Sequence, residues 1–100
     1  MKIAPSQIFS LAVVAELKRI RLAKGVSQKV LAESAGMSRA AVTHIEASIR
    51  NPTMIVCHAL SAALGVKLSN IMRRVERSES RDGASRALPA SNKLKTLRRD

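Results

Sequence analysis

The chain has 100 residues and a formal net charge of +11, with 18 lysine and arginine residues against seven acidic ones. This length fits one small domain with a tail and excludes a two-domain enzyme. The charge favours a polyanionic partner, such as nucleic acid or an anionic membrane surface. Phe9 is the only aromatic residue, so the chain lacks the aromatic side chains on which single-strand binders stack bases. Binding to duplex DNA remains open.

Apolar residues that recur every three or four positions predict helices, separated by glycine, proline or small polar residues. The first predicted helix covers residues 7–24 and ends at Gly25. Its repeating apolar positions are Ile8, Leu11, Ala15, Leu17 and Ile20. The second, residues 28–35, follows the capping residue Ser27, buries Leu31 and Ala32, and ends at Gly36.

Three more helices complete the predicted fold. Ser38 caps a helix over residues 39–47, whose inward pair is Val42 and Ile45. After Pro52, Thr53 opens a helix over residues 54–64 that ends at Gly65, with Met54, Cys57, Leu60 and Leu64 on one stripe. The fifth helix, residues 68–76, carries Leu68, Ile71, Met72 and Val75. The fold class is therefore an all-α, five-helix bundle.

The apolar pattern stops after Glu76, which divides the chain into a domain of residues 1–76 and a tail of residues 77–100. The tail holds four serines, Gly83, Pro89, seven basic residues and three acidic ones, a composition typical of a disordered basic segment. The first 76 residues carry eleven basic and four acidic residues. Most of the positive charge therefore belongs to the predicted domain.

Several kinds of site are not expected. Cys57 is the only cysteine, so an internal disulfide or a zinc cluster is not predicted and the composition suits a reducing cytosol. The apolar run from Ile8 to Ala15 is too short to span a membrane and continues into a helical pattern. Cys57 and His58 point about 100° apart on a helix and do not chelate one metal well. No nucleophile–histidine–carboxylate grouping or phosphate-binding glycine loop is visible. We expect a cytoplasmic, nucleoid-associated protein with no enzymatic activity, cofactor, metal or membrane partner.

The most informative pattern is the pair of short helices joined by Ala35-Gly36-Met37-Ser38, which has the form of a helix-turn-helix. The second helix of such a pair enters the major groove, where side chains near its N-terminus contact base edges. An arginine there can bond to guanine, and a methyl group can contact thymine. The outward residues of the helix over 39–47 are Arg39, Ala40, Thr43 and His44.

From Leu17 to Met72 the sequence resembles the Cro/C1-type helix-turn-helix family, the DNA-binding domains of phage lambda-like repressors and many small bacterial regulators. The resemblance is distributed and gapless. It includes Leu17-Lys18-Arg19-Ile20-Arg21, Val26-Ser27-Gln28, Leu31-Ala32, Ala35-Gly36-Met37-Ser38, Val42, Ile45-Glu46, Asn51-Pro52-Thr53 and Ala63-Leu64-Gly65-Val66. It implies a lambda repressor-like bundle that binds double-stranded DNA.

The resemblance also implies roles for individual residues. Base contacts fall to Arg39, Ala40 and His44, with Thr43 beside them at a position that tends to meet the DNA backbone. Phosphate contacts fall to Gln28, which often also supports the recognition helix, and to Ser38, Arg50 and Asn51. Arg21 and Glu46 match a structural ion pair between the first and third helices. Two positions depart from the family pattern. Ser48 replaces a glycine in a left-handed conformation, and Lys67 replaces the usual capping serine or threonine.

Ile55 and Val56 lie beside the expected core stripe, where family members often carry polar residues. With Met72 they define a candidate homodimer face, although packing under a terminal segment would also explain them. We therefore expect a sequence-specific, dimeric repressor or autoregulator. The main alternative is an antitoxin-like module that neutralises a partner protein, such as a toxin, and autoregulates its operon. A third is a nucleic-acid or transcription-machinery adaptor that depends on its basic tail.

Overall fold

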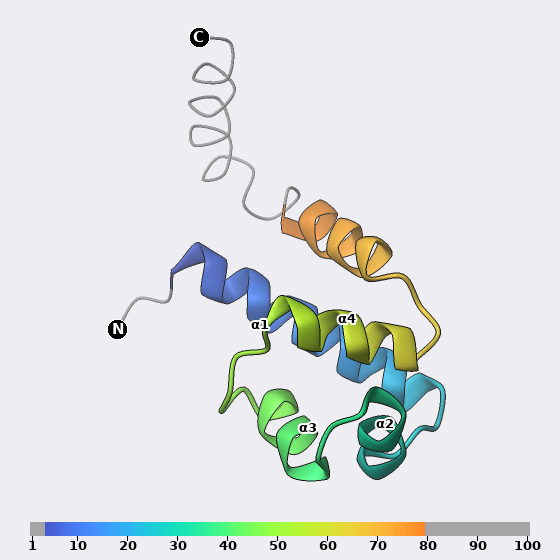
Figure 1. The fold of residues 1–100 in the computed structure, drawn as a ribbon. Coiled ribbons are helices and arrows are strands. Elements are labelled where there is room, and N and C mark those ends of the chain that lie inside the picture. Colours follow the sequence, from blue (N-terminus) through green and yellow to red (C-terminus); the bar gives the residue numbers. More distant parts are fainter. Residues whose placement is uncertain (1–3, 80–100) are drawn as a thin grey trace, which may run out of the picture.

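The computed structural model of the chain describes residues 4–79, and all regular structure in that range is α-helical (Figure 1). The elements are α1 (Pro5–Ala23), α2 (Gln28–Ala35), α3 (Arg39–Glu46), α4 (Met54–Ala63) and a fifth helix, Leu68–Glu79. The predicted all-α, five-helix fold is confirmed. The fifth helix continues three residues past the boundary expected at Glu76. The expected disordered tail otherwise falls on residues 80–100, outside the described part.

The short helices begin at the predicted capping residues. The side-chain hydroxyl oxygens of Ser27, Ser38 and Thr53 each accept a backbone N–H bond of 3.1 Å from the third residue beyond the cap. Each bond satisfies one of the N–H groups that the first turn of a helix leaves without a partner. α1 begins earlier than predicted because Pro5 fits the first helical position, and the Gln7 side chain accepts the Ala4 N–H at 3.0 Å.

α1, α2, α3 and α4 end with the same backbone geometry. In each, one residue adopts a left-handed conformation, and its N–H and the next N–H bond back to carbonyls of the last turn. Glycine occupies this position at Gly25, Gly36 and Gly65, but α3 has Ser48, with φ 62°. The left-handed conformation that the family resemblance implied for Ser48 is confirmed. It carries a Cβ where the other three helices have none, which costs free energy of folding.

The core is a single cluster of aliphatic side chains from all five helices, with the thiol of Cys57. It contains Val13, Leu17, Ile20, Leu31, Ala32, Val42, Cys57, Leu60, Leu64, Ile71 and Val75. The predicted stripe of α1 was wrong at Ile8 and Ala15, which are exposed. At 100° per residue both lie opposite the buried face that Val13, Val14 and Leu17 define.

Met54 was also predicted to be buried, and it is 65% exposed. The stripe of α4 faces the core only from Cys57 onward, because the first turn of α4 lies at the edge of the bundle. Val56 instead packs against the core from the side and is half-buried.

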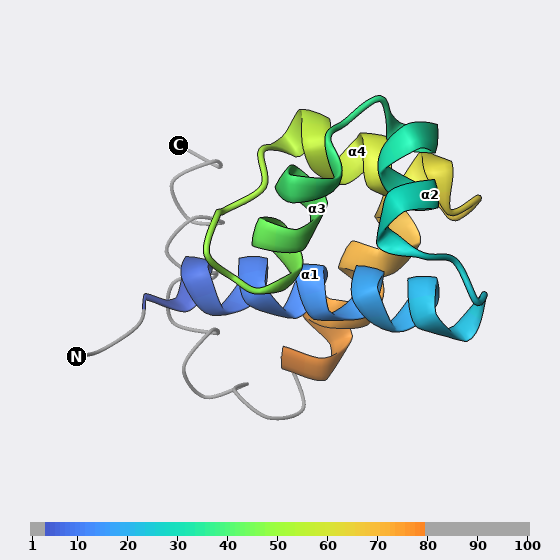
Figure 2. The same cartoon turned by 90° about the horizontal axis from the view of Figure 1, so that it is seen from below.

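The α2–α3 pair and the fifth helix lie on opposite sides of α1 and α4. α2 packs against α3 and α4, and α1 packs against α3. Figure 1 shows the α2–α3 pair below α1 and α4, and the fifth helix above them. Seen from below, α3 lies beside the middle of α1 (Figure 2). An ion pair from Arg74 to Glu16 connects the fifth helix to α1. The α2–α3 pair is therefore presented on the side away from the fifth helix.

Among residues 4–79, no single helix is long and apolar enough to cross a membrane. α4 and the fifth helix reach that length and apolar composition only as a pair, with a bend of 109° between them.

Candidate nucleic-acid interface

α3 has one face in the core and one in solvent. Val42 is completely buried and Ile45 nearly so, while Arg39, Ala40, Thr43 and His44 are exposed. The two buried residues are three apart, so they anchor the same side of an eight-residue helix. The four outward positions named from the sequence therefore share an accessible surface.

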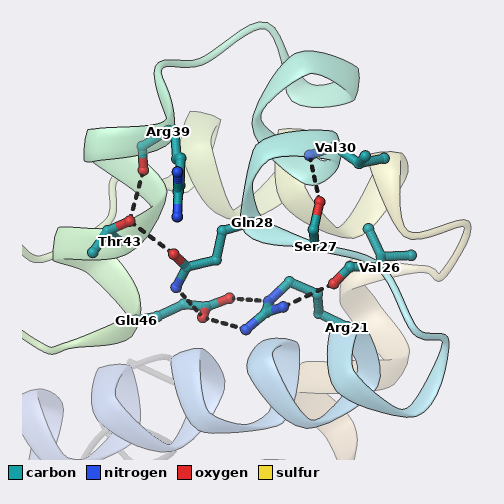
Figure 3. Close-up of polar contacts among 8 residues, drawn as sticks. All are labelled: Arg21, Val26, Ser27, Gln28, Val30, Arg39, Thr43 and Glu46. Atoms are coloured by element: carbon teal, nitrogen blue, oxygen red, sulfur yellow. Dashed lines mark hydrogen bonds and ion pairs between the residues drawn. The ribbon is translucent and has the colours of Figure 1, made fainter.

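A polar network at the centre of the α1–α2–α3 packing fixes the orientation of α3 (Figure 3). Arg21 of α1 forms a bidentate ion pair with Glu46 of α3, with Nε to Oε2 at 2.7 Å and Nη2 to Oε1 at 2.9 Å. The third guanidinium nitrogen donates to the Val26 carbonyl at 2.8 Å. Both charged side chains are almost completely buried. Such a pair stabilises one relative placement of α1 and α3, because separating the partners leaves a buried charge uncompensated.

The network continues through α2. The Gln28 amide donates to Glu46 Oε1 at 3.0 Å, and its carbonyl oxygen accepts from the Thr43 hydroxyl at 2.8 Å. The Thr43 hydroxyl also lies 3.0 Å from the Arg39 carbonyl oxygen. The Gln28 side chain thus bonds to Thr43 on the outward side of α3 and to Glu46 on its inward side. The helix-turn-helix is therefore held together by side chains as well as by its turn.

The protonation of Glu46 follows from this setting. Burial opposes its ionisation, but hydrogen bonds from Arg21 and Gln28, with the charges of Arg21 and Lys18, outweigh burial and lower its pKa. Lys18 lies one helical turn before Arg21 on the same face of α1. No role was predicted for Lys18 from the sequence, although its three-residue spacing from Arg21 was the available signal.

Gln28 supports α3, as the resemblance implied, and the hydrogen bonds of Gln28 and Thr43 within the protein limit what each can offer DNA. Gln28, expected to contact a phosphate, is half-buried with both ends of its amide engaged, which leaves its second amide hydrogen for an outside acceptor. Thr43, expected near the bases, is exposed but directs its hydroxyl proton toward protein oxygens. The methyl group and the oxygen lone pairs of Thr43 are what remain for DNA.

The other expected phosphate contacts lie at the two ends of α3. The Ser38 oxygen caps α3 by accepting from the Ala41 N–H, which leaves its hydroxyl proton to donate elsewhere. Arg50 and Asn51 are exposed in the segment that follows the left-handed Ser48. The His44 carbonyl accepts the N–H groups of Ile49 and Arg50, at 2.9 and 3.3 Å, which ties this segment to the end of α3.

The three residues of the candidate dimer face do not have equal exposure. Ile55 is 81% exposed, whereas Val56 and Met72 are half-buried and Val56 packs on the core. Ile55 and Val56 are neighbours on α4, and Met72 lies on the fifth helix. The accessible apolar surface at this site therefore centres on α4.

Cys57 is buried among aliphatic side chains and His58 is exposed on α4. Burial raises the pKa of the Cys57 thiol, which keeps it in its unreactive protonated form. Among residues 4–79, no three side chains of the metal-binding types gather at one place.

A helix-turn-helix family model, of the Cro/C1 type, matches residues 17–71. The chain is similar in structure to a point mutant of the restriction-modification controller protein C.Esp1396I, with a TM-score of 0.64 and 29% identity, covering 75% of this chain and 97% of that one. It is also similar to the clp gene regulator ClgR from Corynebacterium glutamicum, with a TM-score of 0.65 and 21% identity, covering 87% of this chain and 93% of that one. No curated protein sequence matches significantly.

Proposed function

The chain belongs to the Cro/C1-type helix-turn-helix family of DNA-binding transcriptional regulators, and from this premise we propose that it is a sequence-specific repressor or autoregulator that binds as a homodimer. In this proposal α3 enters the major groove of the operator. Occupancy of the operator blocks a promoter. The proposal assigns no catalytic step to the chain.

One observation carries this proposal: a short exposed helix with hydrogen-bonding side chains is held in a fixed orientation by the buried network around Glu46. Arg39 at the first position of α3 is assigned to a guanine, and Ala40 to a thymine methyl group. His44, one turn further along, is assigned to a base or its adjacent phosphate. Rigid placement supports specificity because each contact then has one geometry.

Phosphate contacts position the domain without reading sequence. We assign them to the second amide hydrogen of Gln28, the Ser38 hydroxyl, Arg50 and Asn51, which lie around the two ends of α3. The controller role of C.Esp1396I, to which the chain is 29% identical, supports a regulatory function for this chain.

The test is selection of bound duplexes from random DNA, carried out with the full chain at two salt concentrations. We expect a palindromic motif whose half-sites are centred about one helical turn apart, roughly 34 Å. Affinity should fall as salt rises, because each neutralised phosphate releases counterions. Recovery of unselected sequences at both salt concentrations would overturn specific recognition, and an asymmetric single site would overturn the dimer.

The antitoxin-like alternative rests on one observation, the exposure of Met54 and Ile55 on α4, since a partner protein needs an accessible apolar surface. It predicts a second small protein encoded beside this one that co-purifies in fixed stoichiometry. If that complex forms and Ile55→Glu disrupts it, the exposed surface of α4 serves a different protein rather than a second copy.

A further inference from the structure

α4 differs from the other helices in its charge. Among the five helices of residues 4–79 it is the one with no lysine, arginine, aspartate or glutamate. Its exposed positions are Met54, Ile55, His58 and Ala62, and Ile55 is the most exposed large apolar residue described. An exposed helix face without charged residues needs an explanation on a domain this basic, because charged side chains normally keep such a face soluble.

Charge decides which partner suits this face. Every copy of the chain carries a formal charge of +11, so two copies repel each other wherever their cations approach. A two-fold contact places the same patch of surface on both sides, so any charged group at its centre meets a like charge. α1, α2, α3 and the fifth helix all expose charged side chains. α4 is the helix with no charged side chain along its whole length, so two copies can meet along its outer face without this cost.

The spacing along α4 fits contact with a second α4. Ile55 and Ala62 are seven residues apart, and with His58 they lie along one side of the helix. When two such helices pack antiparallel across a two-fold axis, the axis passes between positions 58 and 59. Each Ile55 then faces Ala62 of the second copy. A small residue opposite a large one allows close approach and fills the gap.

We propose that the outer face of α4 binds the same face of a second copy, with Ile55 of each chain packed over Ala62 of the other. This inference rests on the proposed function, in which the regulator binds DNA as a homodimer, and it names the surface that forms the dimer. Residues 47–53 connect α3 directly to α4, so joining two α4 helices fixes the separation of two α3 helices. Met72 of the fifth helix stays outside the contact.

The first test is sedimentation equilibrium of the full chain without DNA, over a range of concentrations. We expect the wild-type chain to reach twice its 10.8 kDa mass. Ile55→Glu should remain at the mass of one chain, because each copy would bring an anion into the apolar contact. Leu22→Glu is the matched control, since Leu22 is an exposed apolar residue of α1, and it should dimerise like the wild type. Thermal unfolding reports whether both variants fold.

The second test reads the register. In the double variant Ile55→Cys with Ala62→Cys, oxidised glutathione should produce a disulfide-linked dimer, and proteolytic mapping should join position 55 of one chain to position 62 of the other. Within one helix these positions are about 10 Å apart, too far for a disulfide. Cys57 is buried and does not compete. Single-cysteine variants should crosslink weakly, because the two copies of each position lie far apart.

Three results would overturn the proposed contact: a wild-type chain of single mass at every concentration, an Ile55→Glu variant that dimerises like Leu22→Glu, or disulfides that join 55 to 55. None of these measurements involves DNA. A result against the α4 contact therefore leaves DNA binding to be tested separately by the duplex selection. A chain that dimerises through α4 but selects no motif would keep the contact and remove the proposed function.

Discussion

α3 and α4 are built by the same local rules and present opposite surfaces. Each follows a hydroxyl cap, at Ser38 or Thr53, and each ends in a left-handed residue with the same two backbone bonds. α3 is oriented by a polar network around Glu46 and exposes hydrogen-bonding side chains, whereas α4 contacts the core through apolar groups and exposes Met54 and Ile55. The backbone signals determine where a helix lies, and the outward residues determine what it can bind.

The largest expected effect is the loss of the buried carboxylate of α3. Glu46→Ala leaves the Arg21 guanidinium buried with the Val26 carbonyl as its remaining partner, so we expect a loss of about 3 kcal/mol in the free energy of unfolding. Urea unfolding followed by circular dichroism measures it. Glu33→Ala, at an exposed position of α2, is the control and should change stability by less than about 0.5 kcal/mol. Equal stabilities for the two variants would contradict a structural role for the network.

Next in size is the loss of a base contact. Arg39→Ala should cost about 1–3 kcal/mol on the selected operator and relax the preference at one base position. Fluorescence anisotropy with operator and random duplexes measures both the loss of affinity and the change in base preference. Lys67→Ala should not change the base preference, because Lys67 directly precedes the fifth helix, which lies on the opposite side of α1 and α4 from α3. Equal losses for Arg39→Ala on operator and random DNA would remove it from the base-contacting set.

A smaller effect compares the ends of α3 and α4. Ser48→Gly gives α3 the residue that α4 has at Gly65, and it should raise the free energy of unfolding by about 0.5–1 kcal/mol by relieving the left-handed serine. Differential scanning calorimetry should show a higher Tm. Ser34→Gly, inside α2, should lower the Tm instead, because glycine weakens a helix interior. A Tm for Ser48→Gly at or below the wild-type value would show that the serine is not strained.

The smallest effect is a change in acid sensitivity. Because the network lowers the pKa of Glu46 below its usual 4.5, the stability it contributes is complete above that value and is lost as pH falls through and below it. Stability should therefore decline from about pH 5 to pH 3. Glu46→Gln should show a shallower decline of stability with falling pH. Part of the decline should remain, because bonds from Arg19 outweigh the cost of burial and, with those from Arg74, lower the pKa of Glu16. Identical slopes of stability against pH for the wild type and Glu46→Gln would exclude Glu46 as a source of the acid sensitivity.

Local signals in the sequence predicted most helix boundaries. Ser27, Ser38 and Thr53 each act within three residues, so the starts of α2, α3 and α4 were correct to the residue. The buried face of α1 was harder to predict, because the helix carries its own apolar residues on every side. Only packing against the other helices selects the face that is buried. This is why the repeating apolar positions named for this helix include the exposed Ile8 and omit the buried Val13 and Val14.

Parts of the candidate interface depend on side-chain geometry between helices. The family resemblance implied Arg21 and Glu46 as partners, and the two form an ion pair in the structure. The bond between Thr43 and Gln28, fifteen residues apart, had no local signal because it depends on how closely α2 and α3 pack. The base and phosphate assignments remain predictions that the experiments above address.

The common construction of the helix ends has a consequence for evolution. Ser38 sets the start of α3, the left-handed Ser48 sets its end, and Val42, Ile45 and Glu46 make its inward contacts. Arg39, Ala40 and His44 take part in none of these through their side chains. Mutations at these three positions can accumulate without moving the helix. Under the proposed base contacts, single substitutions at these positions change the DNA preference while the protein stays folded.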